Sequence, residues 1–304
     1  MPSPLRHPLL VLLVLAALLA VAVPLGFGFL GRLHPAFDSF THFRLHLAIA
    51  LVGAALAAMV VGQRAAGALA LAFAAAAFAT IWSAQWSSHR NAASAAAGAA
   101  PPAYTLLQLN LRYDNPDHAA VLSLIARRRP DIITLNEVSQ AWAEALERIR
   151  EAYPHRIICP FPNGRWGSAI LSRRPFAEGI EPMCLDRGAM AVAAIDLGGR
   201  HLDAAALHLS WPWPFEQAWQ LRNLSPRLAE LHGPALLAGD LNATPWSATV
   251  GKVMEAGGLH RVGPAGMTWL HRRLPRWLLP LGLAIDHVFA KGEVQVLSVE
   301  TLED

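Results

Sequence analysis

Three long apolar segments without a charged side chain dominate the first third of the chain. They span residues 9–30, 45–61 and 65–82. A helix needs about 20 apolar residues to cross roughly 30 Å of hydrocarbon, and each segment approaches that length. The first hundred residues also contain five Arg, no Lys and a single acid, Asp38. We therefore expect residues 1–85 to form a membrane anchor of about three transmembrane helices in an integral, multi-pass membrane protein.

Two other interpretations of these segments stay open. A cleaved signal peptide, with Arg6 ahead of its apolar core, accounts for the first segment but not for the other two. Buried helices of a soluble protein account for the second and third segments, and the Ala-rich third is the weakest transmembrane prediction. Arg residues are nearly balanced between the two sides, so charge does not decide the orientation. We expect a cytoplasmic N-terminus, because a short segment with a free amine translocates least readily, and hence an extracytoplasmic C-terminal domain.

Residues 86–103 are rich in Ala and Ser and close with Pro101 and Pro102, which predicts a linker. The rest of the chain, residues 104–304, holds most of the charge. It contains 20 basic residues and 21 acids, a net charge of 20 − 21 = −1. A near-neutral domain has no strongly basic face for gripping duplex DNA and steers a polyanion only weakly.

The pattern of apolar residues in 104–304 predicts strands mixed with helices. We expect strands at 104–111, 131–135, 168–172, 189–196, 202–209, 235–238, 285–290 and 294–299. We expect helices at 119–129, 140–152 and 216–231. Strands and helices that do not alternate strictly favour a layered α+β domain of about 200 residues.

The chain has two cysteines, Cys159 and Cys184, and no CxxC pair. Two cysteines without a CxxC pair argue against a structural zinc site and against a disulfide framework. A single disulfide is one alternative in an oxidising compartment. We favour two buried free thiols.

Polar residues collect where the predicted strands end. Asn110, Glu137 and His208 each follow an apolar run, and Asp240 begins the turn GDLN with Asn242. Carboxylates, amides and imidazoles at the rigid ends of strands can converge on a divalent cation and a phosphate. Each motif also has an ordinary explanation, such as a turn, a helix cap or a core histidine.

Taken in order, these motifs resemble the endonuclease/exonuclease/phosphatase superfamily. The resemblance runs from about Tyr104 to Leu297, and GDLN followed about 40 residues later by IDH is its most specific part. The supporting segments are DIITLNEV, GSAILSRRPF, RGAM, LHL, LLAGDLNATP, MTW and IDHVFA. The resemblance implies a four-layer α/β sandwich, with two packed sheets flanked by helices.

The resemblance also implies site roles and a cofactor, Mg²⁺ or Mn²⁺. Glu137 would be the main metal carboxylate, with Asn110 beside it and Asp286 assisting. Asp240 would orient or deprotonate the attacking water, and Asn242 would bond a phosphate oxygen. Two histidines complete the implied set. His287 would act as a base or contact the phosphate, and His208 would lie on the other side of the scissile group.

Two departures from the family pattern concern these roles. Many relatives place an aspartate between the GDxN and DH motifs to orient the last histidine. Here Glu255, in a predicted helix, is the only acid in that interval. The usual QE pair is Asn136 and Glu137, which retains the metal carboxylate. The acid that would partner His208 stays unassigned, with Asp186 as one candidate.

Two aromatic segments flank the predicted site and could set the substrate. The first, after His208, contains Trp213, and the second, before the DH motif, contains Trp269 and Trp277. Tryptophan with arginine suits a membrane–water interface, so we expect a rim that faces the lipid bilayer and binds substrate. Stacking on single-stranded nucleic acid is the competing use, and core packing is the plain one.

The sequence thus predicts a membrane-anchored, divalent-metal-dependent phosphodiesterase, most simply nuclease-like. A phospholipid- or sphingomyelin-headgroup phosphodiesterase or phosphatase is the first alternative. The alternative from another class is a catalytically inactive, membrane-tethered binding module. The expected partners are a phosphodiester, from nucleic acid or a lipid headgroup, and the bilayer; no protein partner is inferred.

Overall fold

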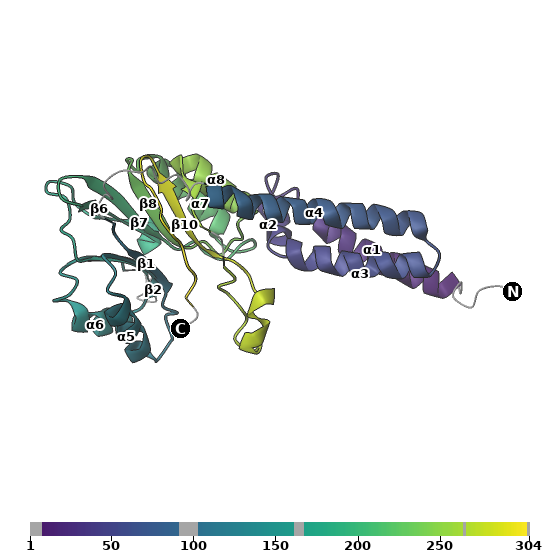
Figure 1. Cartoon of the computed structure of the whole chain (residues 1–304), viewed down its shortest axis with the longest axis horizontal. Helices are drawn as coiled ribbons and strands as arrows, with labels where there is room; N and C mark the ends of the chain where they lie inside the picture. The colour runs from purple at the N-terminus through teal and green to yellow at the C-terminus, as the bar shows by residue number, and fades with distance from the viewer. Residues whose placement is uncertain (1–7, 91–102, 161–166, 264–265, 303–304) are drawn as a thin grey trace.

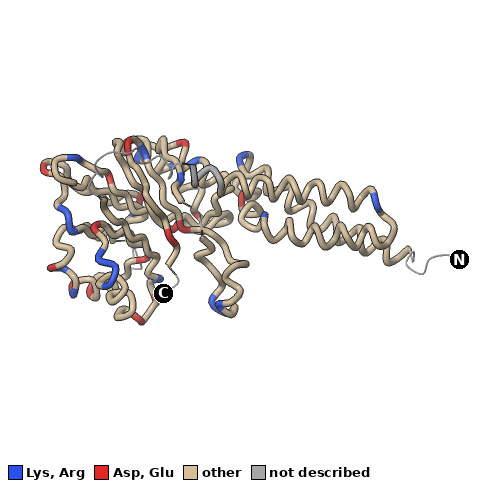
Figure 2. Tube along the Cα trace, in the orientation of Figure 1, with Lys and Arg blue, Asp and Glu red and all other residues tan. Residues whose placement is uncertain are grey.

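A computed structural model describes residues 8–90, 103–160, 167–263 and 266–302, and the side chains of 86–90 are excluded from that description. The described chain forms a helical rod that projects from one end of a layered domain (Figure 1). Figure 2 shows that charged residues gather on the layered domain and are sparse along the rod. The two parts therefore differ in how much charge their surfaces carry.

The rod consists of four helices. They are α1 (Pro8–Phe27), α2 (Pro35–Thr41), α3 (Arg44–Val60) and α4 (Arg64–Arg90). Small side chains of α3 and α4, including Ala55 and Ala74, are fully buried where the helices pack together. Large apolar side chains such as Leu12, Ile49 and Leu69 face outward instead. A helix bundle with an apolar exterior suits a lipid surrounding better than water.

Two of these helices are long and apolar enough to cross a membrane, α1 and the Arg64–Gln85 part of α4. Helices α2 and α3 pass the same test only as a pair bent by 65°. The rod therefore contains two candidate spans, or three if the bent pair is one span. The bend separates α2, which the sequence pattern did not reveal, from the predicted second span.

The layered domain contains two mixed β-sheets. The first has the order β1-β2-β4-β3, and the second has the order β5-β6-β7-β8-β10-β9. Their strands are β1 (Leu106–Asn110), β2 (Ile132–Val138), β3 (His155–Ile158), β4 (Gly167–Ser172), β5 (Met183–Leu185), β6 (Met190–Asp196), β7 (His201–Leu207), β8 (Ala235–Asp240), β9 (His260–Arg261) and β10 (Asp286–Lys291). Only β1–β2 and β7–β8 are parallel pairs among these strands.

Helices cover the outer face of each sheet. Helices α5 (His118–Arg128) and α6 (Gln140–Leu146) pack on the first sheet, and α7 (Gln217–Ala229) and α8 (Ala248–Gly257) pack on the second. Between the sheets, Ile132 and Ile170 meet the alanines of β6 and β7. Side chains along each strand alternate between the core shared by the two sheets and the core under the helices. The result is the four layers expected from the sequence, an α+β sandwich.

Local side chains account for where the helices begin. The carboxylate of Asp117 accepts a hydrogen bond from the amide N–H of Ala120 at the start of α5. The hydroxyls of Ser139 and Ser247 cap α6 and α8 in the same way. Each cap satisfies an amide that lacks a partner in the first helical turn. Short 3₁₀ helices η1 (Glu147–Ile149), η2 (Asp186–Gly188) and η3 (Arg276–Leu281) complete the domain.

Several sequence predictions differ from the structure. The strand predicted at 294–299 is wrong, since those residues form neither strand nor helix. The helix predicted at 140–152 is α6 followed by η1, and it ends at Ile149. Helix α4 continues to Arg90, so the first residues of the predicted linker are helical, and residues 91–102 lie outside the described chain.

The two cysteines form a disulfide, so the preferred prediction of free thiols is wrong. Cys159, just after β3, is bonded to Cys184 in β5. These strands lie at the edges of different sheets, so the bond joins the two sheets. Spacing along the chain gave no sign of this pairing, because it arises from how the sheets stack.

Candidate active site

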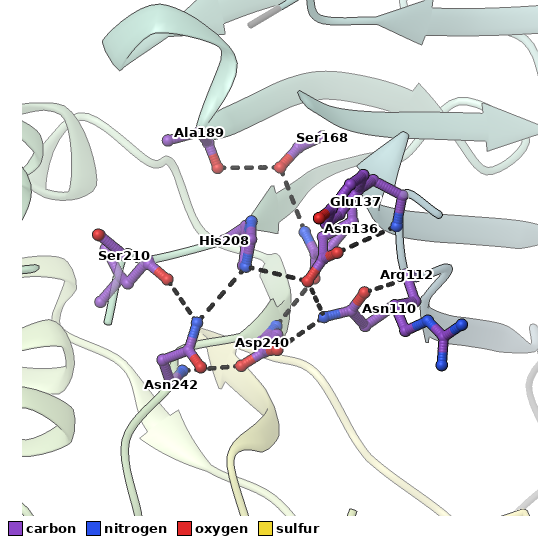
Figure 3. Close-up of polar contacts among 12 residues, drawn as sticks. Asn110, Arg112, Asn136, Glu137, Ser168, Ala189, His208, Ser210, Asp240 and Asn242 are labelled. Atoms are coloured by element: carbon purple, nitrogen blue, oxygen red, sulfur yellow. Dashed lines mark hydrogen bonds and ion pairs between the residues drawn. The ribbon is translucent and has the colours of Figure 1, made fainter. Parts of the chain in front are cut away.

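The polar ends of four strands converge at one edge of the sandwich, between the two sheets (Figure 3). Parallel pairing places Asn110 of β1 opposite Asn136 of β2. In the second sheet, antiparallel pairing places Asp286 of β10 opposite Asp240 of β8. Hydrogen bonds then cross from one sheet to the other, for example from the amide N–H of Asp240 to Oδ1 of Asn136 (2.8 Å).

Glu137, His208 and Asp240 form the centre of this site. One potential ligand atom from each lies within 4.8 Å of the other two. The Nε2 atom of His208 is 3.9 Å from Oε1 of Glu137. The Nδ2 group of Asn110 donates to Oε1 of Glu137 (3.0 Å) and to Oδ2 of Asp240 (2.7 Å), so one amide links the two carboxylates.

A bulge in β2 explains how neighbouring residues reach the same site. The pairing of β2 with β4 shifts register between Leu135 and Val138, and Glu137 has a backbone φ of 57°. Successive residues of a regular strand point to opposite faces, but a bulge re-aims one of them. Asn136 and Glu137 both therefore face the site. A positive φ is costly for Glu, and such strain concentrates at functional positions.

The GDLN segment carries Asp240 into the site. A Cβ on Gly239 would come within 1.9 Å of the Leu207 carbonyl oxygen, so β8 and β7 can approach this closely only at a glycine. Oδ1 of Asp240 accepts the amide N–H of Asn242 (2.7 Å). Asn242 has a φ of 47°, and its Nδ2 donates to the carbonyl of Leu209 (2.9 Å). That amide also lies 3.5 Å from Nε2 of His208.

Burial disfavours the charged forms of the acids and the histidine in this site. It raises the pKa of Asp240 well above its ordinary value, and the nearby Asp286 and Glu137 carboxylates add to the increase. Burial likewise raises the pKa of Asp286, with Glu137 contributing. Burial lowers the pKa of His208, against the opposing effect of Glu137. Three close carboxylates beside a neutral imidazole are stabilised when a cation joins them.

The donor set fits Mg²⁺ or Mn²⁺. Both ions favour carboxylate and amide oxygens, and Mn²⁺ also accepts an imidazole nitrogen. Glu137, Asp240 and the carbonyl oxygen of the Asn110 side chain supply such atoms, and Asp286 lies next to Asp240 across the β10–β8 pair. The residues present are therefore consistent with a bound divalent ion.

Sequence reasoning did not assign roles to the polar residues that hydrogen-bond the carboxylates of this site or their neighbours. The side-chain amide of Gln108 donates to Oδ1 of Asp286 (3.0 Å). The side-chain amide of Asn136 donates to the hydroxyl of Ser168 (3.2 Å). The hydroxyl of Ser168 donates to the carbonyl of Ala189 (2.9 Å). Gln108 was detectable, because it precedes Asn110 by two residues and so shares its face of β1.

The structure brings His208 to the site but not His287. The His287 ring is buried, and its Nε2 lies 2.7 Å from the carbonyl oxygen of Ala243. It packs against Phe289, which belongs to the core between the second sheet and its helices. Strand β10 is regular from Asp286 onward, so Asp286 and His287 point to opposite faces. Burial lowers the pKa of His287 to about 3, which keeps the ring neutral.

Asp186, a candidate partner for His208, interacts elsewhere. It lies in η2, and burial raises its pKa while Asn223 and Gln220 of α7 bond its side chain. Within the described residues, the side chain of His208 instead neighbours Glu137 and Asn242.

The three predicted substrate-binding tryptophans lie in two loops that contact the rod. Trp277 of η3 is 75% exposed and Trp213 is 52% exposed, while Trp269 packs edge-on against Trp211 (centroids 5.7 Å apart). The carbonyl of Trp213 accepts the hydroxyl of Ser39 in α2 (3.0 Å). The η3 segment contacts α3, since the His46 ring lies 2.7 Å from the carbonyl oxygen of Leu281. Both aromatic loops thus border the end of the rod.

Comparison with known proteins identifies a family. A sequence model of the Endonuclease/Exonuclease/phosphatase family matches residues 107–304. None of the curated proteins matches the chain.

Solved structures with a similar fold are distant in sequence. An endonuclease/exonuclease/phosphatase from Beutenbergia cavernae is 19% identical (TM-score 0.45), and the match covers 62% of this chain and 64% of that one. A β-hairpin deletion mutant of beta toxin from Staphylococcus aureus is 15% identical (TM-score 0.49, 67% and 95% covered). TDP2 of D. rerio, complexed with a single-strand DNA product, is 19% identical (TM-score 0.46, 61% and 82% covered).

Proposed function

Because this chain belongs to the endonuclease/exonuclease/phosphatase family, we propose that residues 104–304 form a divalent-metal-dependent phosphodiesterase. The observation that carries the proposal is the cluster of Glu137, His208 and Asp240, whose ligand atoms lie within 4.8 Å of one another. The bulge at Glu137 and the amide of Asn110 support this arrangement. Carboxylates held this close together can share a bound cation, which offsets the cost of placing them side by side.

In this proposal Glu137, Asn110 and Asp286 hold Mg²⁺ or Mn²⁺. When bound, the ion would offset the charge that builds on the phosphate oxygens during displacement. Asp240 orients the attacking water and accepts its proton, for which a raised pKa is suited. Asn242 donates its side-chain amide to a phosphate oxygen.

His208 and His287 have different roles in this proposal. His208, neutral and next to Glu137 and Asn242, lies on the other side of the scissile group and contacts the phosphate. His287 was expected to act as a base or to contact the phosphate, but its ring is buried against Phe289. We assign it to holding the carbonyl of Ala243, directly after Asn242.

We further propose that the rod anchors the enzyme in a membrane, with the catalytic domain on the extracytoplasmic side. The outward-facing leucines of α1 and the length of α4 support the anchor. The disulfide between Cys159 and Cys184 supports an extracytoplasmic position of the catalytic domain, because such bonds persist in oxidising compartments and are rare in the cytosol.

The leading substrate is a nucleic-acid phosphodiester, and the second candidate is a phospholipid headgroup. The position of Trp213 and Trp277 beside the rod favours the second candidate, since exposed tryptophans at this level would meet the bilayer surface. Arg272, Arg273 and Arg276 lie in the same segment as Trp277 and carry the charge that attracts lipid phosphates. A role in binding single-stranded nucleic acid uses the same side chains.

The test uses the full chain in detergent with bis(p-nitrophenyl) phosphate, Mg²⁺, Mn²⁺ or chelator. We expect metal-dependent hydrolysis that Asp240→Asn abolishes and that Glu144→Gln, an exposed acid on α6, leaves unchanged. Single-stranded DNA and phospholipid vesicles, offered separately, then distinguish the two substrates. Lack of hydrolysis of every substrate with either metal would contradict the enzyme and favour a membrane-tethered binding module.

A further inference from the structure

Helix α2 is docked on the layered domain at the start of α8. Asp38 of α2 is 4% exposed. Its Oδ1 accepts the amide N–H of Ala248 (2.8 Å), and its Oδ2 accepts the amide N–H (2.9 Å) and the hydroxyl (3.0 Å) of Thr249. Asp38 therefore caps a catalytic-domain helix from more than two hundred residues away in sequence. Within the rod, Gly31 leaves room for this carboxylate, because a Cβ there would lie 2.6 Å from Oδ1 of Asp38.

A chain of buried hydrogen bonds leads from Asp38 to the catalytic turn. The hydroxyl of Thr249 also lies 3.0 Å from Oε1 of Gln217 in α7. The buried side-chain amide of Gln217 donates to the carbonyls of Leu241 (3.0 Å) and Asn242 (3.2 Å). Asp38 and Asn242 are thus joined through two side chains.

A second set of contacts joins the same turn to the end of α2. Nδ1 of His42 accepts the amide N–H of Thr244 (3.2 Å), two residues after Asn242. The indole N–H of Trp246 donates to the carbonyl of Thr41 (2.8 Å). Four residues of the segment after Asn242 thus bond α2 or His42, the residue that follows it: Thr244, Trp246, Ala248 and Thr249.

Asn242 has a φ of 47°, in the left-handed region. Asn adopts this region more readily than most residues with a side chain, and the contacts around the turn then select one arrangement of it. The side chain of Asn242 also has to meet a phosphate oxygen at hydrogen-bonding distance, where misplacement by about 1 Å can reduce rate by roughly 10²-fold.

From these contacts we infer that Asp38 and His42 are positioning residues for catalysis. Docking of α2 fixes the conformation of the turn that contains Asn242, and so the position of the Asn242 side chain. The N-terminal helices then complete the active site in addition to tethering it. This inference rests on the proposed phosphodiesterase function. It assigns the helical rod a role in turnover, and it predicts that the catalytic domain works fully only with α2 in place.

The decisive variants are Thr249→Val and Thr249→Ser in the full chain. Valine keeps the shape of the side chain but removes the hydroxyl between Asp38 and Gln217, whereas serine keeps the hydroxyl. With bis(p-nitrophenyl) phosphate and Mn²⁺, we expect valine to lower kcat about tenfold or more at an unchanged KM, and serine to retain most of kcat. Asp38→Asn should also lower kcat. Arg32→Gln, which removes only the exposed ion pair with Glu255 across the same junction, should not.

A purely structural role gives a different result. If Thr249→Val and Asp38→Asn keep the wild-type kcat while wild-type activity is present, the inference is overturned and the phosphodiesterase stands. If Asp38→Asn does not fold, the threonine pair decides alone.

If the wild type hydrolyses no substrate, the proposed function fails and hydrogen exchange tests the coupling. Faster exchange of the amides of 241–244 in Thr249→Val than in Thr249→Ser supports it, and equal exchange contradicts it.

Discussion

Two buried polar clusters in this protein contrast in how their charge is satisfied. The junction cluster consists of Asp38, His42, Thr244 and Thr249, and both carboxylate oxygens of Asp38 accept hydrogen bonds. The catalytic cluster consists of Glu137, His208, Asp240 and Asp286. Its members crowd three carboxylates together, and burial raises the pKa of two of them, Asp240 and Asp286.

The difference separates polar groups that stabilise a fold from those kept for chemistry. A buried carboxylate that accepts several N–H groups favours one arrangement of its neighbours. A buried carboxylate beside other carboxylates disfavours the folded state, and proteins retain such groups where function needs them. Opposite effects on stability are therefore expected when each cluster is neutralised.

The largest effect should follow from neutralising the catalytic cluster. Asp240→Asn keeps the size of the side chain but removes the carboxylate that we propose as the acceptor of the proton of water. We expect activity on bis(p-nitrophenyl) phosphate to fall by roughly 10³-fold or more, as for other essential catalytic groups. Because burial raises the pKa of Asp240, its charged form disfavours folding at neutral pH. The metal-free variant should therefore unfold at a higher temperature than the wild type, and a lower temperature would contradict the contrast.

Removing the carboxylate of the junction cluster should do the reverse. Asp38→Ala leaves the amide N–H groups of Ala248 and Thr249 without their acceptor, at about 1–3 kcal/mol for each buried group. We expect a loss of about 3 kcal/mol or more, measured as a lower unfolding temperature in detergent. Ser39→Ala on the same helix removes one exposed contact and serves as the control. An unchanged unfolding temperature for Asp38→Ala would show that the junction is not part of the folded unit.

The disulfide provides a reference that belongs to neither cluster. Cys159 and Cys184 are 25 residues apart, and closing a loop of that length stabilises by about 3 kcal/mol in the chain-entropy model. We expect Cys184→Ser, or reduction of the wild type, to lower the unfolding temperature accordingly while metal-dependent activity at low temperature persists. Reduction that leaves the unfolding temperature unchanged would contradict the presence of the bond.

Adding metal should stabilise through the catalytic cluster alone. A ligand at 100 times its Kd stabilises the folded state by about 2.7 kcal/mol. Titration with Mn²⁺ should raise the unfolding temperature of the wild type, and chelator should reverse the change. Glu137→Gln should abolish the shift, whereas Arg32→Gln at the junction should retain it. A shift that survives Glu137→Gln would place the ion elsewhere.

Most of the layered domain was predictable from the sequence, because its longer strands are apolar runs of the right period. The motifs likewise named Glu137, His208 and Asp240, which the structure brings together. The short strands β3, β5 and β9 gave no such signal. At two to four residues, they depend on neighbours for pairing.

What the sequence did not reveal depends on contacts between distant segments. Cys159 and Cys184 meet because two sheet edges stack, and Asp38 meets Thr249 because α2 folds back on α8. As the only acid in the first hundred residues, Asp38 was conspicuous, but its partner was not. His287 differs from these cases, since the family motif predicted a site role for it, whereas in the structure its ring bonds the carbonyl of Ala243 and packs against Phe289.

The smallest effect on stability is expected at Trp277, on the rim where the rod meets the layered domain. Its side chain is 75% exposed, so Trp277→Ser should change the free energy of unfolding by less than about 0.5 kcal/mol. If the rim faces a bilayer, the same change should lower the rate on phospholipid vesicles but not on bis(p-nitrophenyl) phosphate, which needs no interface. Ile180→Ser removes another exposed apolar side chain, in the loop between β4 and β5, and should affect neither rate. An equal loss on both substrates would instead place Trp277 in contact with the catalytic cluster, and no loss on vesicles would contradict a bilayer-facing rim.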